Sequence, residues 1–396
     1  MTYTMKTFKE LVQREFRLFF ANRTLLSVMI FAPIIYAVLI GFVYKEGKVT
    51  ELPVIVVDQD NSPLSNKLTD MIEDSERLHI KQIKRENTGT QEDLLNSQAV
   101  LVVTIPERFE ADVLQKRYPE VNTFINTANL LTANMASQGI QSVLGTFSAG
   151  IEIQGLMKKG VPQAATQYEP FKSNYIRLFN PTGNYFTFMW PAVLAVVLQQ
   201  VLLLAFAVSF ASELQNRTFQ TELMSYTRNS VLAIFVKALP IWLLTIGVLG
   251  FYYVMHGVFH APMPVSLQPF VITTSMFVLA ITFMGILFSV VIPDALKATQ
   301  ILMMFSTPAF LIGGFSWPLS SMPEGVQFIA NLIPLTPFLN AHKILLIEQG
   351  SLQNVLPFVK HLGIQIVAYG VLAIAALQYK MKVWSKAETG VVSVEG

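Results

Sequence analysis

The sequence predicts a mainly α-helical polytopic membrane protein with six transmembrane helices and an inserted extracytoplasmic α/β domain. The first observation is a run of 56 residues, 238–293, that contains no Lys, Arg, Asp or Glu. A bilayer core about 30 Å thick takes ~20 helical residues to cross, so this run fits two crossings. The second observation is composition, because only 14% of the residues are charged, against roughly a quarter in soluble domains.

Composition also limits the classes of function. The net charge of +2 is too small to indicate nucleic acid as a partner. The absence of cysteine excludes disulfides, thiolate metal sites and cysteine nucleophiles. No Gly-x-x-x-x-Gly-Lys phosphate loop occurs, so we expect this chain to bind no nucleotide cofactor and to hydrolyse none by itself.

Residues 1–23 are predicted to form a cytoplasmic amphipathic helix. One helical face gathers the apolar residues Phe8, Leu11, Val12, Phe16, Phe19 and Phe20. This pattern favours a helix in the membrane interface over a solvated helix on a soluble core, because a span-length apolar segment follows at once. That segment, 24–44, is the first transmembrane helix and is too long for the apolar region of a signal peptide.

Residues 45–178 differ abruptly in composition and are predicted to form a soluble α/β domain. From Lys45 to Arg177 the chain holds 17 of the 26 acidic residues and 14 of the 28 basic ones. Short apolar runs bounded by turn residues predict strands over 54–57, 99–105 and 121–125.

Helices are expected after these strands. Ser62 and Pro63 are suited to the N-cap and the first position of one helix, and Pro106 opens another over 107–115. Further on, a hydrophobic stripe predicts a helix over 131–157. At roughly 40 Å, it is long enough to act as a stalk that returns the chain to the bilayer.

Residues 179–384 are predicted to hold the other five transmembrane helices. Span-length apolar segments occur at 185–211, 237–255, 270–292, 298–315 and 362–379. A polar loop, 212–231, separates the second helix from the third. The segment 317–356 is apolar but contains four prolines, so we expect it to be re-entrant or to lie at the membrane interface.

Six crossings put both termini on one side, and the distribution of Lys and Arg indicates which side. The N-terminal tail, the loop 212–237, the Asp294 loop and the C-terminal tail together carry 12 of these residues. The loop 256–269 carries none, and 317–356 carries only Lys343. The positive-inside rule therefore predicts cytoplasmic termini and an external α/β domain for this multi-pass protein. Its expected location is the bacterial cytoplasmic (inner) membrane.

Two pairs of polar residues outside the predicted spans are candidates for a catalytic or metal-binding site. Asp58 and Asp60 form a pair of carboxylates, but turn formation and helix capping explain them better. His256 and His260 are spaced for one helical face, yet no carboxylate lies nearby, and we predict no metal site.

Few polar side chains occur at membrane depth. Gln199 and Gln200, midway along the second span, either form helix–helix hydrogen bonds or line a substrate path. No acid–base pair is expected within the spans, which argues against a proton-coupled carrier or an intramembrane hydrolase.

Two stretches carry recognisable motifs. The first comprises Phe315-Ser316-Trp317-Pro318-Leu319, Met322-Pro323 and Ile333-Pro334-Leu335-Thr336-Pro337; the second is the loop Glu213 to Leu223, with Thr218-Phe219 and Glu222-Leu223. Together they resemble the type-2 ATP-binding-cassette (ABC) exporter permeases. Two positions depart from the family pattern, since Arg217 stands where Gly is usual and Leu214 replaces a usual Arg. The layout resembles the multidrug-type subgroup with a large extracytoplasmic domain after the first span.

The resemblance implies a permease that dimerises with a second copy or a paralogue and binds separate ABC ATPase subunits, which carry the ATP and Mg. The N-terminal helix and the loop 212–231 would contact the ATPase. The implied coupling residues are Phe16, Arg17, Glu213, Arg217, Thr218, Phe219 and Glu222. The implied pathway and gate residues are Gln199, Gln200, Phe305, Phe310, Leu311 and Phe315, for which ordinary packing of apolar spans is the alternative.

The implied function is export of a hydrophobic or amphipathic substrate, such as a drug, lipid or lipid-linked molecule. A periplasmic adaptor and membrane lipid are further candidate partners. A membrane-anchored sensor or assembly scaffold, whose external domain binds a ligand, is the alternative. Co-purification separates the two hypotheses, because only an exporter should retain an ATPase.

Overall fold

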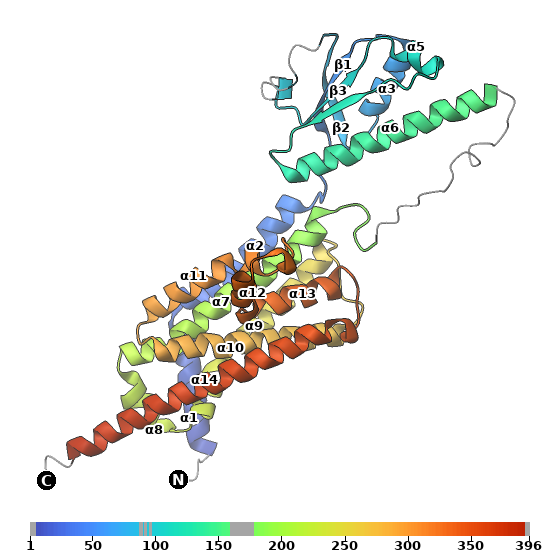
Figure 1. Cartoon of the computed structure of the whole chain (residues 1–396). Helices are drawn as coiled ribbons and strands as arrows, with labels where there is room; N and C mark the ends of the chain where they lie inside the picture. The colour runs from blue at the N-terminus through green and yellow to red at the C-terminus, as the bar shows by residue number, and fades with distance from the viewer. Residues whose placement is uncertain (1–4, 87–89, 91–92, 95–96, 159–177, 393–396) are drawn as a thin grey trace. The chain divides into compact units, whose positions relative to one another are not determined.

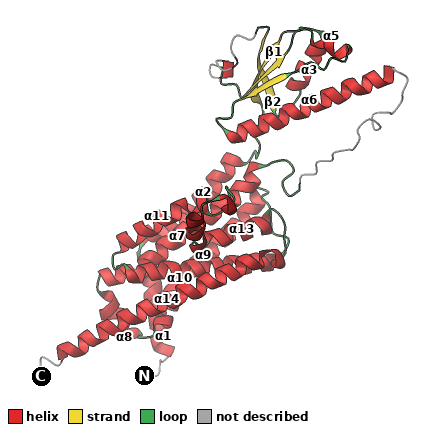
Figure 2. Cartoon of the chain, in the orientation of Figure 1, coloured by secondary structure: helices red, strands yellow, loops and turns green. Residues whose placement is uncertain are grey.

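The computed structural model describes residues 5–86, 90, 93–94, 97–158 and 178–392. Its chain forms two compact units (Figure 1). Met1–Gly47 and Arg177–Gly396 form the first, which we call the helical unit, and Lys48–Ile176 form the second, which we call the sheet unit. Among the described residues, all strands belong to the sheet unit (Figure 2).

The helical unit contains six helices that are long and apolar enough to cross a membrane. They are α2 (Arg23–Tyr44), α7 (Tyr185–Gln215), α9 (Ser230–Val258), α10 (Leu267–Val291), α11 (Ala295–Ile312) and α14 (Leu352–Val392). These helices confirm the predicted six spans.

Shorter elements lie at the two ends of the helical unit. At one end are α1 (Met5–Ala21), a π-helical turn at Phe219–Leu223 and α8 (Met224–Tyr226). Towards the other end are α12 (Glu324–Leu332) and α13 (Leu335–Leu346), with a 3₁₀ turn at Leu319–Ser321 before them (Figure 1). The proline-interrupted segment 317–356 therefore contains two separate helices, of which α13 is largely buried.

Several helix boundaries differ from the predicted spans, the largest difference being α14, which begins at Leu352 rather than 362. Two of the earlier starts follow from local capping. The third span begins at Ser230 rather than 237, since the side chain of Asn229 accepts hydrogen bonds from the backbone of the first turn. The fifth span begins at Ala295 rather than 298, because Asp294 caps it. That helix ends before Gly314, whose φ of 79° interrupts helical geometry.

Helix α7 is the centre of the helical unit. It packs against α2, α10, α11 and α13. Its buried residues lie all around the helix, and Trp190, Phe206 and Phe210 are fully buried. A helix that is apolar on every face is typical of a position enclosed by other helices.

Side chains of α14 form hydrogen bonds with the last carbonyl groups of α12. Gln365 donates a hydrogen bond to the Asn331 carbonyl at 2.8 Å, and a ring nitrogen of His361 lies 2.9 Å from the same oxygen. Tyr369 donates to the Leu332 carbonyl. These carbonyls have no partner within their own helix, so α14 supplies the hydrogen bonds that the bilayer cannot.

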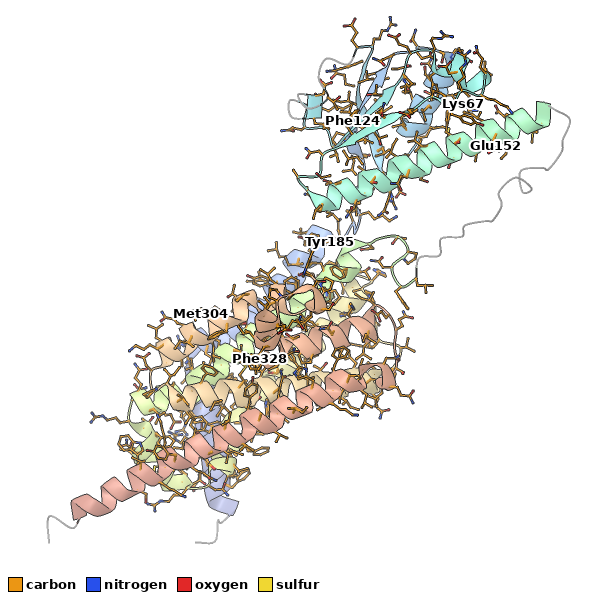
Figure 3. All side chains as sticks on the ribbon, viewed as in Figure 1. Lys67, Phe124, Glu152, Tyr185, Met304 and Phe328 are labelled. Atoms are coloured by element: carbon orange, nitrogen blue, oxygen red, sulfur yellow. The ribbon has the colours of Figure 1, made fainter. Side chains whose placement is uncertain are left out.

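Apolar side chains also remain on the outside of the helical unit. Met304 of α11 and Phe328 of α12 are two of the most exposed (Figure 3). Exposed apolar surface of this kind suits contact with lipid or with another protein chain.

The sheet unit has strand order β2-β1-β3-β4, with β1 parallel to both β2 and β3, and β4 antiparallel to β3. Its elements are β1 (Leu52–Asp58), α3 (Pro63–Glu73), β2 (Leu78–Lys84), β3 (Leu101–Ile105), α5 (Phe109–Leu114), β4 (Asn122–Ile125) and α6 (Leu130–Lys158). The N-cap prediction is confirmed, because Ser62 accepts from the Ser65 backbone at 3.1 Å ahead of Pro63.

Helices α3, α5 and α6 pack on one face of the sheet. Ile140, Val143 and Phe147 of α6 are buried in the same core as the apolar side chains of β1 and β3. The helix predicted over 107–115 starts only at Phe109, because Arg108 adopts a left-handed φ of 62°.

The close approach of α10 to α7 predicts a stability effect. A Cβ atom on Gly285 would lie 2.5 Å from Cβ of Phe206, which is fixed to the backbone and cannot move aside. We expect Gly285→Ala to destabilise the protein by about 1–3 kcal/mol through overpacking. The measurement is the apparent melting temperature of the purified protein in detergent.

Gly250 of α9 is the matched control, because a Cβ there would meet no described atom within 4 Å. Gly250→Ala should leave the melting temperature unchanged or slightly higher. Equal melting temperatures for the two variants would contradict the packing described here.

Candidate functional site

Five charged side chains from three helices and the π-helical turn meet at one end of the helical unit. Arg14 of α1 donates to Glu213 of α7 (Nη1–Oε1, 3.0 Å) and to Glu222 of the π-helical turn (Nη2–Oε2, 3.0 Å). Lys237 of α9 donates to Glu15 of α1 (Nζ–Oε2, 2.9 Å) and also to Glu213. We call these five residues the charge cluster.

Most of the charge cluster is removed from solvent. The side chains of Lys237 and Glu15 are each 4% exposed, and that of Glu213 is 5% exposed. Arg14 is 10% exposed, whereas Glu222 is 50% exposed and forms the rim. The four buried charges sum to zero, which is the arrangement that makes burial of charges tolerable.

Helix periodicity explains how α1 contributes to the cluster. Glu15 lies four residues from both Leu11 and Phe19, and all three are buried on one face of the helix. Burial by itself lowers the pKa of Arg14, but its hydrogen bond to Glu213 and the nearby carboxylate charges outweigh this effect. The pKa of Arg14 therefore lies above its ordinary value, and the guanidinium stays charged.

The structure divides the predicted coupling residues into two groups. Glu213 and Phe219 are buried, and Phe16 and Thr218 are half-buried, so that these side chains pack within the helical unit. The exposed ones are Arg17, Arg217 and Glu222.

The backbone at Arg217 has the conformation for which a glycine is best suited. Its φ of 59° lies in the left-handed region, which glycine adopts without steric cost. The turn therefore has the conformation that the usual Gly favours, although an arginine occupies it.

Sequence reasoning missed Arg14, Glu15 and Lys237. The helices that contain the second and third spans do carry one acid–base pair, Glu213 of α7 and Lys237 of α9, at the ends of these helices next to α1. The available signal was a carboxylate on the apolar stripe of α1 and a single Lys inside an apolar helix. Both indicate a charge that needs a buried partner.

The predicted pathway residues Gln199 and Gln200 lie on α7, which packs against α11. Gln199 is buried and donates to the Ser306 hydroxyl of α11 at 3.2 Å, while its Oε1 has no hydrogen-bond partner among the described residues. Gln200 is half-buried.

The predicted gate residues do not form one group. The ring of Phe315 lies 6.0 Å from that of Phe310 and stacks on Phe188 of α7 at 4.5 Å. Phe305 and Leu311 are exposed on the outer face of α11 instead. Only Phe310 and Phe315 therefore meet.

Neither the pair Asp58 and Asp60 nor the pair His256 and His260 is arranged as a chemical site. Oδ1 of Asp58 accepts hydrogen bonds from the backbone of Asp60 and Asn61, at 3.0 Å each, as expected for a turn. His256 is buried, whereas His260 is exposed in the turn after α9, so the two imidazoles do not share a helical face.

Comparison with known proteins identifies relatives over nearly the whole chain. The model of the ABC-2 family transporter proteins matches residues 23–375. The inner membrane transport permease YhhJ of Escherichia coli (strain K12) is 20% identical over 379 residues, which cover 94% of this chain and 97% of YhhJ. The probable multidrug ABC transporter permease YbhR of the same organism is 20% identical over 355 residues, covering 87% of this chain and 91% of YbhR.

The family match includes all of the first five span helices and most of the sixth. Both relatives are permeases, and the six apolar helices described above are consistent with that role. The chain therefore belongs to the ABC-2 family of transporter proteins and is a multi-pass permease subunit of the inner membrane.

Proposed function

We propose that this permease exports a hydrophobic or amphipathic substrate across the cytoplasmic membrane, driven by separate ATPase subunits that bind ATP and Mg. The charge cluster is the observation that carries the proposal. It connects α1 and the loop 212–231, the two segments expected to meet the ATPase, to the span helices α7 and α9. A force on either segment would thereby reach the membrane helices.

The burial of the charge cluster supports its role in transmitting force. A buried ion pair that loses one partner costs about 3–5 kcal/mol, because the remaining charge stays unpaired. Movement of α1 away from α7 and α9 would break the contacts of Arg14 with Glu213 and of Lys237 with Glu15, and would leave each of these buried ions with one partner fewer. The ends of α1, α7 and α9 should therefore move together.

The exposed residues are the proposed contacts with the ATPase. Arg17 and Arg217 face solvent, and each can pair with an opposite charge on a partner, whereas Glu222 is the exposed rim of the cluster and already pairs with Arg14. Glu213 and Phe219 act by positioning this surface, since burial keeps them from touching a partner.

Helix α7 supplies a path from this surface to the proposed gate. It is continuous from Tyr185 to Gln215, roughly 46 Å at 1.5 Å per residue. The same helix carries Glu213 near one end, Gln199 near the middle and Phe188 near the other end. Rocking of α7 would therefore change its contacts with Ser306 and Phe315, and open a path along α11.

A dimer accounts for the exposed apolar face of α11. Met304, Phe305 and Leu311 are exposed in the single chain, which suits packing against a second copy or a paralogue. In such a dimer, Phe305 and Leu311 of each subunit would face the other subunit and line a path between the two.

The orientation proposed here has cytoplasmic termini and an extracytoplasmic sheet unit, as in the multidrug-type subgroup. Because the chain has no cysteine, single cysteines can report it. Lys116→Cys in the sheet unit should react with an impermeant maleimide in spheroplasts with an intact inner membrane. Lys382→Cys on α14 should react only after permeabilisation. Reaction of both under the same condition would contradict the orientation.

The coupling surface is tested by a variant that removes charge without harming the fold. Arg217→Gly relieves the left-handed backbone and should keep or raise the melting temperature. Combined with Arg17→Gln, it should weaken binding of the ATPase that copurifies with the wild type by roughly tenfold, since each exposed pair contributes up to about 1 kcal/mol. The measurement is the ATPase concentration at half-maximal association in detergent.

Lys297→Gln is the control for this experiment, because Lys297 is an exposed basic residue outside α1 and the loop 212–231. Its ATPase binding should match the wild type. Equal binding by the double variant and the control would exclude the proposed contact surface, and failure of any ATPase to copurify would exclude the proposed function.

A further inference from the structure

A cavity of about 50 Å³ lies within the helical unit, near the end of α9 opposite to Lys237. Its walls come from α7, α9, α10 and α13 and from the loop between α9 and α10. Four buried polar side chains line it, Tyr252, His256, Thr274 and His342, together with the exposed Tyr253. The rest of the lining is apolar or aromatic, and no charged side chain takes part.

Each of these four side chains has a polar atom that lacks a hydrogen bond. The atoms are Oη of Tyr252, Nδ1 of His256, Oγ1 of Thr274 and Nδ1 of His342, and none has a partner among the described residues. All four side chains are more than nine-tenths buried. Buried polar groups in native proteins nearly always have a partner, so four unpaired ones around one cavity indicate that something else supplies the hydrogen bonds.

Thr274 shows that these groups are free for an external partner. Threonine in a span helix usually donates to the carbonyl four residues earlier, and Thr245, Thr273 and Thr282 do so at 2.7–2.8 Å. Thr274, next to Thr273 on the same helix, makes no such bond. Its hydroxyl lines the cavity instead.

The lining defines the chemistry of the occupant. Hydroxyls and uncharged imidazoles both donate and accept hydrogen bonds, which suits a hydroxyl group. A charged group would find no opposite charge in the lining. The volume exceeds the ~15 Å³ that one water needs and is well below the roughly 150 Å³ cavity that holds benzene, so a small head group fits and a ring does not.

The cavity also has a side through which a longer molecule can extend. Tyr253, Met263 and Pro264 line it and are not buried, and Tyr253 is 52% exposed. Exposed apolar side chains, Val265 and Leu267, follow in the same loop and helix start. An apolar tail attached to a head group in the cavity would therefore meet apolar surface.

We propose that this cavity binds the uncharged, hydroxyl-bearing head group of an amphiphile whose apolar tail lies in lipid. A resident membrane lipid and an exported amphiphile share this chemistry. The inference does not require ATPase coupling, because the full-length permease alone forms the cavity.

The test uses the purified permease in detergent, with monooleoylglycerol as the probe. We expect it to raise the melting temperature saturably. Methyl oleate has the same tail without hydroxyls and should not do so, and oleoyl lysophosphatidic acid should fail because its phosphate would be unpaired. Thr274→Val should weaken the apparent affinity for monooleoylglycerol about five- to tenfold, the effect of one lost hydrogen bond.

Thr273→Val is the matched control, because its hydroxyl already bonds to the Pro269 carbonyl, and it should keep the wild-type affinity. Tyr252→Phe removes a second unpaired hydroxyl and should act like Thr274→Val, which guards against a folding defect in one variant. Equal stabilisation by methyl oleate, or equal affinity in the Thr273 and Thr274 variants, would overturn the proposal and leave trapped water as the occupant.

An experiment with the permease–ATPase complex in proteoliposomes distinguishes a resident membrane lipid from an exported amphiphile. A photoactivatable monoacylglycerol should label the loop 259–266 in both cases. If the occupant is exported, ATP lowers the labelling; if it is a resident lipid, ATP leaves it unchanged. No labelling of this loop with or without ATP would also overturn the proposal, whereas loss of ATPase association alone would affect only the proposed function.

Discussion

Helix α1 is held against the span helices by charges that have been taken out of water. Arg14 and Lys237 each contact carboxylates on two different elements, so the five charges form one connected network rather than separate ion pairs. Burial fixes the relative positions of these helices, because a buried charge is tolerated only while an opposite charge lies next to it. The position of the proposed ATPase-binding surface follows from this constraint.

The second constraint is the enclosure of α7. It is surrounded by apolar neighbours, and Gly285 of α10 allows a contact with Phe206 that any larger residue would obstruct. Protein interiors are packed closely enough to transmit small displacements. A helix that contacts the charge cluster at one end and α11 and Phe315 further along is suited to transmit a displacement from the proposed ATPase-binding surface to the proposed gate.

Sequence periodicity and length predicted the six spans and several elements of the sheet unit, because long apolar runs and caps such as Ser62 are local signals. Strand β2 was not predicted, since Leu78–Lys84 is largely polar and lies at the edge of the sheet. The pairing of charges within the cluster was not predicted either, although Glu213 and Glu222 were singled out as coupling residues. Lys237 and Glu15 are 222 positions apart, and only the packing of α1 on α9 brings them together.

The central claim is that the charge cluster makes α1 and α9 one rigid body. Spin labels at Glu10→Cys and Val231→Cys, both exposed positions in a chain without cysteine, report the distance between the two helices. The account predicts one narrow distance that stays the same while the bound ATPase hydrolyses ATP, and a broad distribution when Lys237→Met is added. A distance that changes during hydrolysis, or a narrow one in the Lys237→Met background, would contradict it.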